Sequence, residues 1–201
     1  TSHQKSCRNL MRLHSKNSVM VLLNDFVRVY DDALDEETCD FLIGFFDQSP
    51  DKHERIDEDS KPSFTQLNLT ENSKEISHIH NLLIAKTFEY RNDYYEFVDK
   101  RVFPESHAFE QYRIKRYEPD GKDMFDTHVD VKTYASARRF LAFLWYLNDV
   151  PNEGNTVFEG LTIEPKKGKL VIFPPLWMFP HRGEPVVECP KYILSTYLHY
   201  K

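Results

Sequence analysis

The stretch RRFLAFLWYLNDVPNEGNTVF, residues 138–158, is a run of aromatic and branched residues that leads into a Pro-Asn-Glu-Gly turn signal. Such a run favours a β-strand followed by a tight turn. Runs of the same character flank it: FEQYRIKRY (109–117), GKLVIFP (168–174) and KYILSTYLHY (191–200). Asp-Gly and Lys-Lys-Gly turn signals separate these runs, so the chain beyond about residue 103 is predicted to be mostly strand.

The first half of the sequence has a different periodicity. Residues 35–48, DEETCDFLIGFFDQ, place acids in a first turn and apolar residues at helical spacing, which predicts a helix. A second, longer helix is predicted from Ser73 onward for the same reason. Residues 19–34 favour an extended segment, and the charged stretch 51–69 favours a surface loop that leads into a strand.

Helices followed by strands indicate an α+β fold, and the strands are numerous enough for a double-stranded β-helix, or jelly roll, with supporting N-terminal helices. The chain has 201 residues, of which 40% are hydrophobic, so it can bury one sizeable core. We therefore expect a single domain over residues 1–201, with a helical part at about 20–100 and a jelly-roll core at about 103–201.

Charge and composition exclude several classes of protein. The net charge of -6 argues against nucleic acid as the main partner, because phosphate binding needs clustered Lys and Arg. No apolar run is long enough to cross a membrane, and the first twenty residues lack the apolar centre of a signal peptide. Cys7, Cys39 and Cys189 are too few and too scattered for a disulfide framework. We expect a cytoplasmic protein.

The segment FDTHVDV, residues 125–131, carries the candidate chemistry. His128 and Asp130 are two residues apart, so on a strand both side chains leave the same face of the sheet. His181 begins a later predicted strand after a Pro-rich approach and is the candidate third ligand. Two histidines and one carboxylate form a facial triad that leaves positions open on Fe(II). By itself the H-x-D pair is a weak signal, because strand histidines are more often packed or solvated than ligating.

Lys191 lies at the head of the last predicted strand, ten residues after His181. A neighbouring strand of a barrel can carry its ammonium group into the same cavity, where a buried cation needs an anion. The distal carboxylate of 2-oxoglutarate can supply that anion. The alternative is a surface lysine at the start of a strand.

Four segments in this order resemble the 2-oxoglutarate- and Fe(II)-dependent dioxygenases, and within them the prolyl 4-hydroxylase-like branch. They are RYEPDGKDMFDTHVD, RRFLAFLWYLNDVPNEGNTVF, EPKKGKLVIFP and HRGEPVVECPKYILSTYLHY, which together span about residues 109–200. Two departures concern the branch and the substrate: Asn155 stands where a glycine or an acid is common, and Tyr197 stands where tryptophan is frequent.

The resemblance implies roles for single residues. It makes His128, Asp130 and His181 the iron ligands, which are also the catalytic residues. It makes Lys191 the partner of the distal carboxylate of 2-oxoglutarate. Tyr117 and Tyr146 match tyrosines that hydrogen-bond this co-substrate, although both could equally be core aromatic residues. The presence of Asp130 favours hydroxylation over halogenation.

For the reaction, the resemblance implies hydroxylation of an unactivated C–H bond by molecular oxygen, with ascorbate restoring oxidised iron. The branch suggests a prolyl residue in a peptide or protein as substrate. A free amino acid or another small molecule is the alternative. A non-catalytic jelly-roll module that binds metal, and a zinc hydrolase with the same three ligands, are the alternatives from other classes.

Overall fold

The computed structural model describes residues 23–57 and 62–201 of the chain. In these ranges the α-helices are α1 (Glu36–Asp47) and α2 (Ser77–Val98). Short 3-10 helices form at η1 (Leu23–Phe26), η2 (Pro50–Lys52), η3 (Thr70–Asn72) and η4 (Lys100–Val102). Both predicted α-helices are therefore present.

The larger sheet contains eight strands of the described chain, in the order β1-β10-β7-β12-β5-β3-β2, with β4 pairing β12 beside this path. Their bounds are β1 (Arg28–Tyr30), β2 (His53–Asp57), β3 (Ser63–Asn68), β4 (His107–Phe109), β5 (Arg113–Tyr117), β7 (Arg139–Tyr146), β10 (Leu170–Phe173) and β12 (Lys191–Tyr200). All the pairings are antiparallel. The last predicted strand, β12, thus lies near the middle of the sheet.

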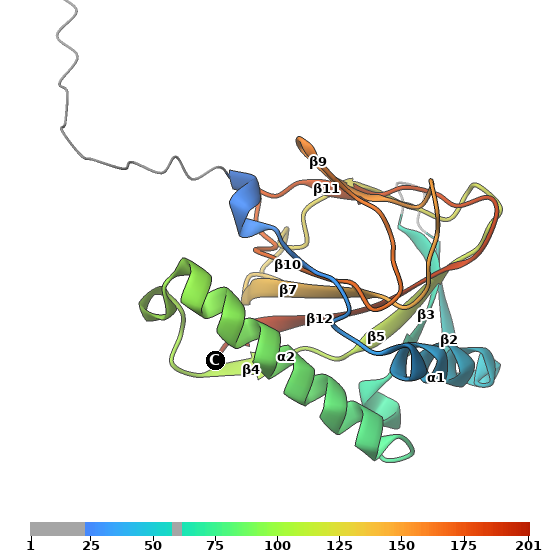
Figure 1. The fold of residues 1–201 in the computed structure, drawn as a ribbon, viewed down its shortest axis with the longest axis horizontal. Coiled ribbons are helices and arrows are strands. Elements are labelled where there is room, and N and C mark those ends of the chain that lie inside the picture. Colours follow the sequence, from blue (N-terminus) through green and yellow to red (C-terminus); the bar gives the residue numbers. More distant parts are fainter. Residues whose placement is uncertain (1–22, 58–61) are drawn as a thin grey trace, which may run out of the picture.

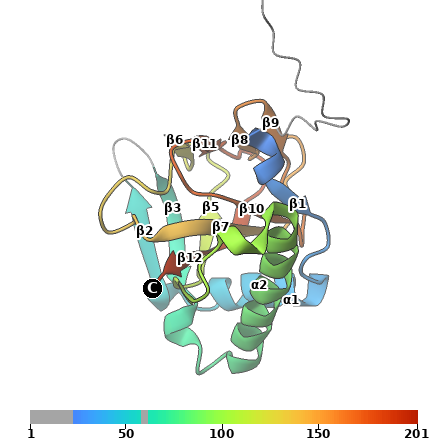
Figure 2. The same ribbon diagram turned by 90° about the vertical axis from the view of Figure 1, so that its left-hand side faces the viewer.

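A smaller sheet faces the first and has the order β6-β11-β8-β9 among the described residues. Its strands are β6 (Phe125–His128), β8 (Thr156–Phe158), β9 (Leu161–Ile163) and β11 (His181–Gly183). Figure 1 and Figure 2 show the larger sheet between this small sheet on one side and α1 and α2 on the other. The arrangement confirms the predicted α+β jelly roll with supporting helices.

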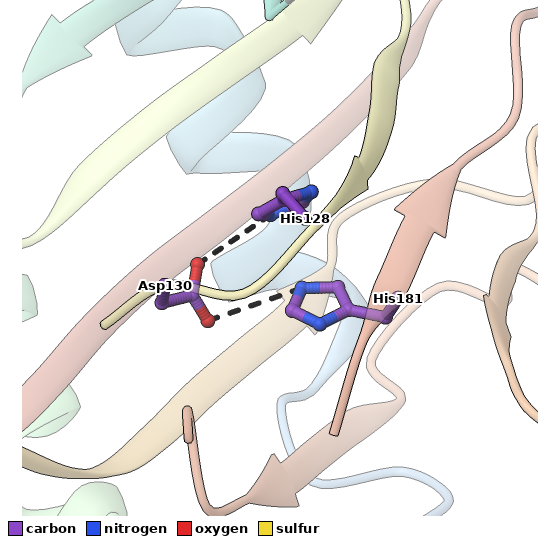
Figure 3. Close-up of side chains that lie close together, drawn as sticks. All are labelled: His128, Asp130 and His181. Carbon is purple, nitrogen blue, oxygen red and sulfur yellow. Dashed lines mark ion pairs between the residues drawn. The ribbon is translucent and has the colours of Figure 1, made fainter. Parts of the chain in front are cut away.

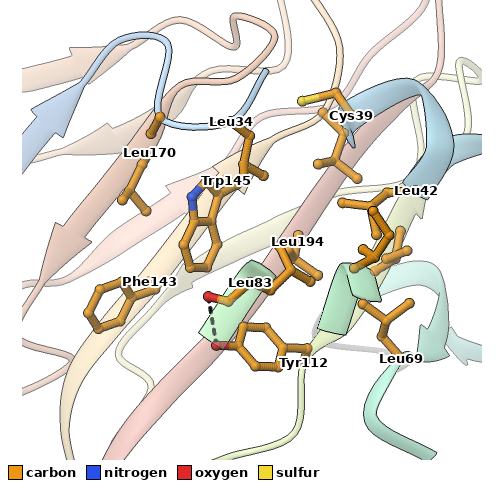
Figure 4. Packing of buried hydrophobic residues seen from close by; sticks show 14 of the residues in the cluster. Leu34, Cys39, Leu42, Leu69, Leu83, Tyr112, Phe143, Trp145, Leu170 and Leu194 are labelled. Carbon is orange, nitrogen blue, oxygen red and sulfur yellow. Dashed lines mark hydrogen bonds between the residues drawn. The ribbon is translucent and has the colours of Figure 1, made fainter. Parts of the chain in front are cut away.

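Alternation along the strands of the large sheet creates two hydrophobic cores. In β12, Leu194 and Leu198 belong to the core under the helices, whereas Ile193 belongs to the core between the sheets. Successive side chains of a strand point to opposite faces, so a strand with both faces covered is apolar throughout. Figure 4 shows the core under the helices, where Trp145 and Tyr112 pack with leucines of several elements. The inner core holds the site described below.

Local signals explain the first helix. The side chain of Asp35 accepts a hydrogen bond of 2.7 Å from the backbone N–H of Thr38, which caps the helix N-terminus. Glu36 and Glu37 in the first turn complement the positive end of the helix dipole. The same acids supported the sequence-based prediction.

Two sequence-based expectations were wrong in part. Residues 53–57, expected in a loop, form the strand β2, which pairs with β3 from His53 opposite Leu67 to Asp57 opposite Ser63. Its charged side chains are those of an edge strand, where charge discourages pairing with other chains. Leu23–Phe26, expected to be extended, forms η1, and residues 19–22 lie outside the described residues.

The first half of the chain therefore contributes more than helices, because β1, β2 and β3 all join the large sheet. None of the helices in the described ranges has the length and apolarity that a membrane crossing requires. The cytoplasmic location stays a prediction.

Candidate metal centre

His128, Asp130 and His181 come together at one end of the small sheet. His128 is the last residue of β6, His181 is the first residue of β11, and the two are direct partners in the antiparallel pairing. Asp130 follows β6 after one residue, beyond the end of the strand. One potential ligand atom from each residue lies within 4.8 Å of the others (Figure 3). The distance from Nε2 to the nearest Asp130 oxygen is 3.5 Å for His128 and 3.9 Å for His181.

Backbone carbonyls orient both imidazoles. Nδ1 of His128 lies 2.7 Å from the carbonyl oxygen of Asp126, and Nδ1 of His181 lies 3.0 Å from that of Phe179. A carbonyl oxygen only accepts, so each Nδ1 carries the hydrogen, and in the neutral ring the lone pair is on Nε2. Burial lowers the pKa of His181, which favours the neutral ring. Both lone pairs thus face Asp130.

Asp130 presents a carboxylate with one unused oxygen. Its Oδ1 accepts a 2.9 Å hydrogen bond from the hydroxyl of Tyr197, whereas the buried Oδ2 has no hydrogen-bond partner among the described residues. Burial would raise the pKa of Asp130, but the interactions with His128, His181 and Tyr197 outweigh it and lower that pKa to about 2 when the imidazoles are protonated. With neutral imidazoles, a bound metal ion supplies the positive charge in their place. Two lone pairs and an ionised carboxylate that face one another need a cation between them. The three residues therefore fit a divalent metal with open positions.

Aromatic rings enclose the two histidines. Phe125 stacks on His128 with ring centroids 3.5 Å apart. Phe158 and Phe173 pack against His181 at 5.1 Å and 4.9 Å. These rings restrict imidazole rotation and exclude water from this side of the site.

The structure brings Lys191 into the same small cavity as the three residues, which has a volume of about 40 Å³. Lys191 begins β12 and is 2% exposed. Its Nζ donates to the carbonyl oxygens of Gly154 at 2.8 Å and Glu184 at 3.3 Å. No carboxylate in the described part of the chain forms an ion pair with it. Burial lowers the pKa of Lys191 to about 8, so an anion bound beside it stabilises its charged form.

The two predicted tyrosines occupy different positions. Tyr117 lines the cavity, and its ring centroid lies 4.5 Å from Nζ of Lys191. Tyr146 is fully buried, and its hydroxyl donates a 2.6 Å hydrogen bond to Oγ1 of Thr156, which does line the cavity. The structure thus places Thr156 between Tyr146 and the cavity.

Sequence reasoning missed Arg139 and Lys115, which also surround the site. Nη1 of Arg139 donates to the carbonyl oxygen of Asp130 at 3.1 Å, and its guanidinium lies 4.1 Å from the ring centroid of Tyr197. Lys115 lines the same cavity as the triad. The sequence held one signal for Lys115. It lies two residues before Tyr117 on a predicted strand, so both side chains point to the same face of the sheet.

A jelly roll that joins two histidines, one carboxylate and a buried, unpaired lysine in one cavity defines the class of non-haem iron oxygenases that use a 2-oxo acid. The family model described as the 2OG-Fe(II) oxygenase superfamily matches residues 112–199. This segment of the chain therefore resembles the 2OG-Fe(II) oxygenase superfamily. The match confirms the predicted superfamily, the dioxygenase class and the use of Fe(II) and 2-oxoglutarate.

Solved structures of prolyl hydroxylases share the fold. A viral collagen prolyl hydroxylase from Paramecium Bursaria Chlorella virus-1, in its 2OG complex, has a TM-score of 0.66 and 22% identity over 88% of this chain and 97% of that chain. A prolyl-4-hydroxylase from Pseudomonas putida has a TM-score of 0.68 and 16% identity over 89% of this chain and 97% of that one. No curated protein sequence matches the chain.

A third similar structure is a prolyl hydroxylase from Trichoplax adhaerens in complex with a hypoxia inducible factor oxygen degradation domain peptide fragment. Its TM-score is 0.64, with 14% identity over 87% of this chain and 83% of that chain. At these identities the likeness establishes the fold.

Proposed function

We propose that this chain hydroxylates a prolyl residue of a peptide or protein, with Fe(II) held by His128, Asp130 and His181. The observation that carries the proposal is the convergence of three ligand atoms within 4.8 Å in the cavity that also holds the buried cation of Lys191. A purely structural metal site is closed by four protein ligands and has no use for a counter-charge to a dicarboxylate.

Each residue has a defined share in the chemistry. Bound Fe(II) and 2-oxoglutarate supply oxidative decarboxylation, which releases succinate and carbon dioxide and inserts one oxygen atom of O₂ into a C–H bond. His128 and His181 offer Nε2 because their Nδ1 hydrogens are held by carbonyls. Lys191 binds the distal carboxylate of 2-oxoglutarate beside Tyr117, and Tyr146 positions Thr156 at the cavity wall. We also propose that ascorbate restores oxidised iron, as the family resemblance implies.

A groove beside the metal site supports a peptide substrate. It has a volume of about 780 Å³, is lined by residues of β2, β3 and β5, and shares His128 and Asp130 with the small cavity. This volume lies at the upper end of the range for small-molecule sites, which is about 300–1,000 Å³. The peptide held by the Trichoplax adhaerens enzyme supports the same choice. A free amino acid is the second candidate, because it would also fit the groove.

The proposal is tested by anaerobic titration of the Fe(II)-loaded protein with 2-oxoglutarate, which is followed by the visible charge-transfer band of the chelate. We expect a band in the wild type, no band in Asp130→Ala, and an affinity at least about tenfold weaker in Lys191→Met because a charge-assisted contact is lost. The exposed Lys166→Met is the matched control and should behave as the wild type. Absence of the band from wild-type protein that holds Fe(II) would favour a non-catalytic metal-binding jelly roll.

The substrate is tested separately. Proline-containing peptides and free amino acids are incubated with the enzyme, 2-oxoglutarate and oxygen, and products are examined for the mass of one added oxygen atom. Hydroxylated proline within a peptide supports the first candidate. Hydroxylation of free amino acids alone would support the second candidate, a free amino acid substrate.

A further inference from the structure

Lys115 lies at the junction of the small cavity and the groove. It is the middle residue of β5, opposite Ile193 of β12 and Gln66 of β3. Alternation directs its side chain to the face between the sheets, which it shares with Tyr117. Lys115 lines both the cavity and the groove, as do His128 and Asp130. Its ammonium group thus borders the place where a substrate would meet the metal.

Lys115 has no anionic partner among the residues that the structure describes. Its Nζ lies 5.0 Å from the ring centroid of Phe64. Among the other cations of the groove, Arg113 and Arg139 contact Glu110, and Lys52 contacts Glu75. Burial lowers the pKa of Lys115 to about 8, and the charge of Asp130 opposes this effect. A desolvated cation without a partner carries a free-energy cost that a bound anion removes.

Charge balance indicates which anion is missing. In the proposed site, the two positive charges of Fe(II) and that of Lys191 balance the carboxylate of Asp130 and the two carboxylates of 2-oxoglutarate. These groups together are neutral, so none of them compensates the positive charge of Lys115. An anionic group that arrives with the primary substrate would neutralise it.

We propose that Lys115 forms a subsite that binds a carboxylate of the primary substrate next to the carbon that is hydroxylated. This inference rests on the proposed function. The carboxylate comes either from an acidic side chain beside the target residue or from an α-carboxylate, as in a free amino acid or at a peptide C-terminus. Both sources present the same group to Nζ, so the experiment has to separate them.

The test measures binding, without turnover, to protein loaded with Mn(II) in place of Fe(II) and saturated with 2-oxoglutarate under anaerobic conditions. The probes are two pools of peptides with a central proline and randomised flanks: one contains Asp and Glu, and the other has Asn and Gln in their place. A third pool contains no acidic side chains and ends in proline with a free C-terminal carboxylate. A fourth pool is the same except that this carboxylate is amidated. Retention of each pool is quantified by mass spectrometry.

We expect the wild type to retain acidic over amide peptides, or free over amidated C-termini, by about 10- to 100-fold, the effect of one charge-assisted contact. A preference for acidic over amide peptides would show that the carboxylate is that of an acidic side chain. A preference for free over amidated C-termini would show that it is an α-carboxylate. Lys115→Met and Lys115→Gln should abolish the preference. Lys52→Met should keep it, because Lys52 also lines the groove but is already paired with Glu75.

Equal retention of charged and uncharged pools by the wild type, including no retention of either, would overturn the subsite. So would a preference that persists in both Lys115 variants. The 2-oxoglutarate titration is run on the same proteins. If Lys115→Met lowers the affinity for 2-oxoglutarate as much as Lys191→Met does, Lys115 binds the co-substrate and the inference is wrong. If the wild type gives no charge-transfer band, the proposed function fails and the subsite with it. A normal band without any carboxylate preference refutes the subsite alone.

Discussion

The hydroxyl of Tyr197 donates a hydrogen bond of 2.9 Å to Oδ1 of Asp130, and the two residues are 67 positions apart in the sequence. This bond occupies one carboxylate oxygen and leaves Oδ2 directed at His181, whose Nε2 lies 3.9 Å away. The tyrosine that departs from the usual tryptophan of the family thus holds a candidate ligand in place. Such outer contacts orient metal ligands and tune their affinity.

Replacing Tyr197 by phenylalanine should weaken metal binding. Tyr197→Phe keeps the ring against the Arg139 guanidinium but removes the hydrogen bond to Asp130, so the carboxylate gains rotational freedom. We expect Mn(II) or Fe(II) affinity to fall by about tenfold, the lower end of such outer-shell effects. Calorimetric titration of the metal measures the change.

Tyr192→Phe is the matched control. Tyr192 lies on the same strand, and its hydroxyl also donates to a carboxylate, that of Asp47 at 2.8 Å, away from the site. Its loss should leave metal affinity unchanged. An equal fall in both variants would show that the Tyr197 bond has no specific role in metal binding.

Arg139 links Asp130 to a buried acid. Its Nε and Nη2 donate to the two oxygens of Glu110, both at 2.7 Å, while Nη1 holds the carbonyl of Asp130. Arg139→Met should destabilise the protein by about 3 kcal/mol, because it leaves a largely buried carboxylate without its main partner. Urea unfolding measures the loss.

The double variant Glu110→Gln/Arg139→Met tests this cause. With the carboxylate also neutralised, we expect part of the lost stability to return, because the buried charge that lost its main partner is gone. If the loss of unfolding free energy in the double variant equals the sum of the losses in Glu110→Gln and Arg139→Met, Glu110 and Arg139 are not coupled.

Gly154 lies against Lys191, and its backbone conformation and close neighbours favour glycine at this position. Its φ is +65°, and a Cβ there would lie 2.6 Å from Cγ1 of Val186 and 3.3 Å from Cδ of Lys191. Gly154→Ala should lower the free energy of unfolding by about 2–3 kcal/mol and weaken the binding of 2-oxoglutarate. The reason is that the strain of a left-handed backbone conformation adds to a steric clash. Gly160→Ala, at φ +72° with a flexible Asn24 side chain as its nearest neighbour, should cost only about 1 kcal/mol. Equal losses would mean that the contact with Val186 relaxes freely.

Sequence reasoning reached the triad and Lys191 because their signals are local. His128 and Asp130 were singled out by their spacing on a predicted strand and His181 by its place at a strand start, and the order of the four family-like segments supported all three. Their convergence also depends on the exact pairing of His181 with His128, which no single segment encodes.

Lys115 and β2 show where such reasoning ends. Whether Lys115 faces a solvated surface or the metal cavity depends on the register of β5 against β12 and β3, which is set by long-range packing. The residues of β2 looked like a loop because an edge strand tolerates charge on its exposed positions. Tertiary contacts outweighed local composition in both cases.

Asp123 gives a prediction of pH dependence at the entry to β6. It is 1% exposed and accepts hydrogen bonds from Arg55 at 2.6 Å and 2.9 Å, from Ser63 at 2.7 Å and from the backbone N–H of Glu118 at 3.0 Å. Burial would raise the pKa of Asp123, but these donors lower it from 3.8 to about 2. Because the folded pKa is depressed, the ionised carboxylate contributes stability that is complete above about pH 4 and is lost as the pH falls towards 2.

Asp123→Asn should therefore be less stable than the wild type by about 2 kcal/mol at pH 7. The difference should shrink as the pH falls below 4, because the wild type loses its carboxylate while the amide does not titrate. Urea midpoints of both proteins from pH 7 down to the lowest pH at which the wild type is folded measure this. Arg55→Met is the partner control, since it removes the main donor and should flatten the same part of the profile. A difference between Asp123→Asn and the wild type that stays constant over the acidic range would show that packing of the side chain, and not its ionisation, stabilises this turn.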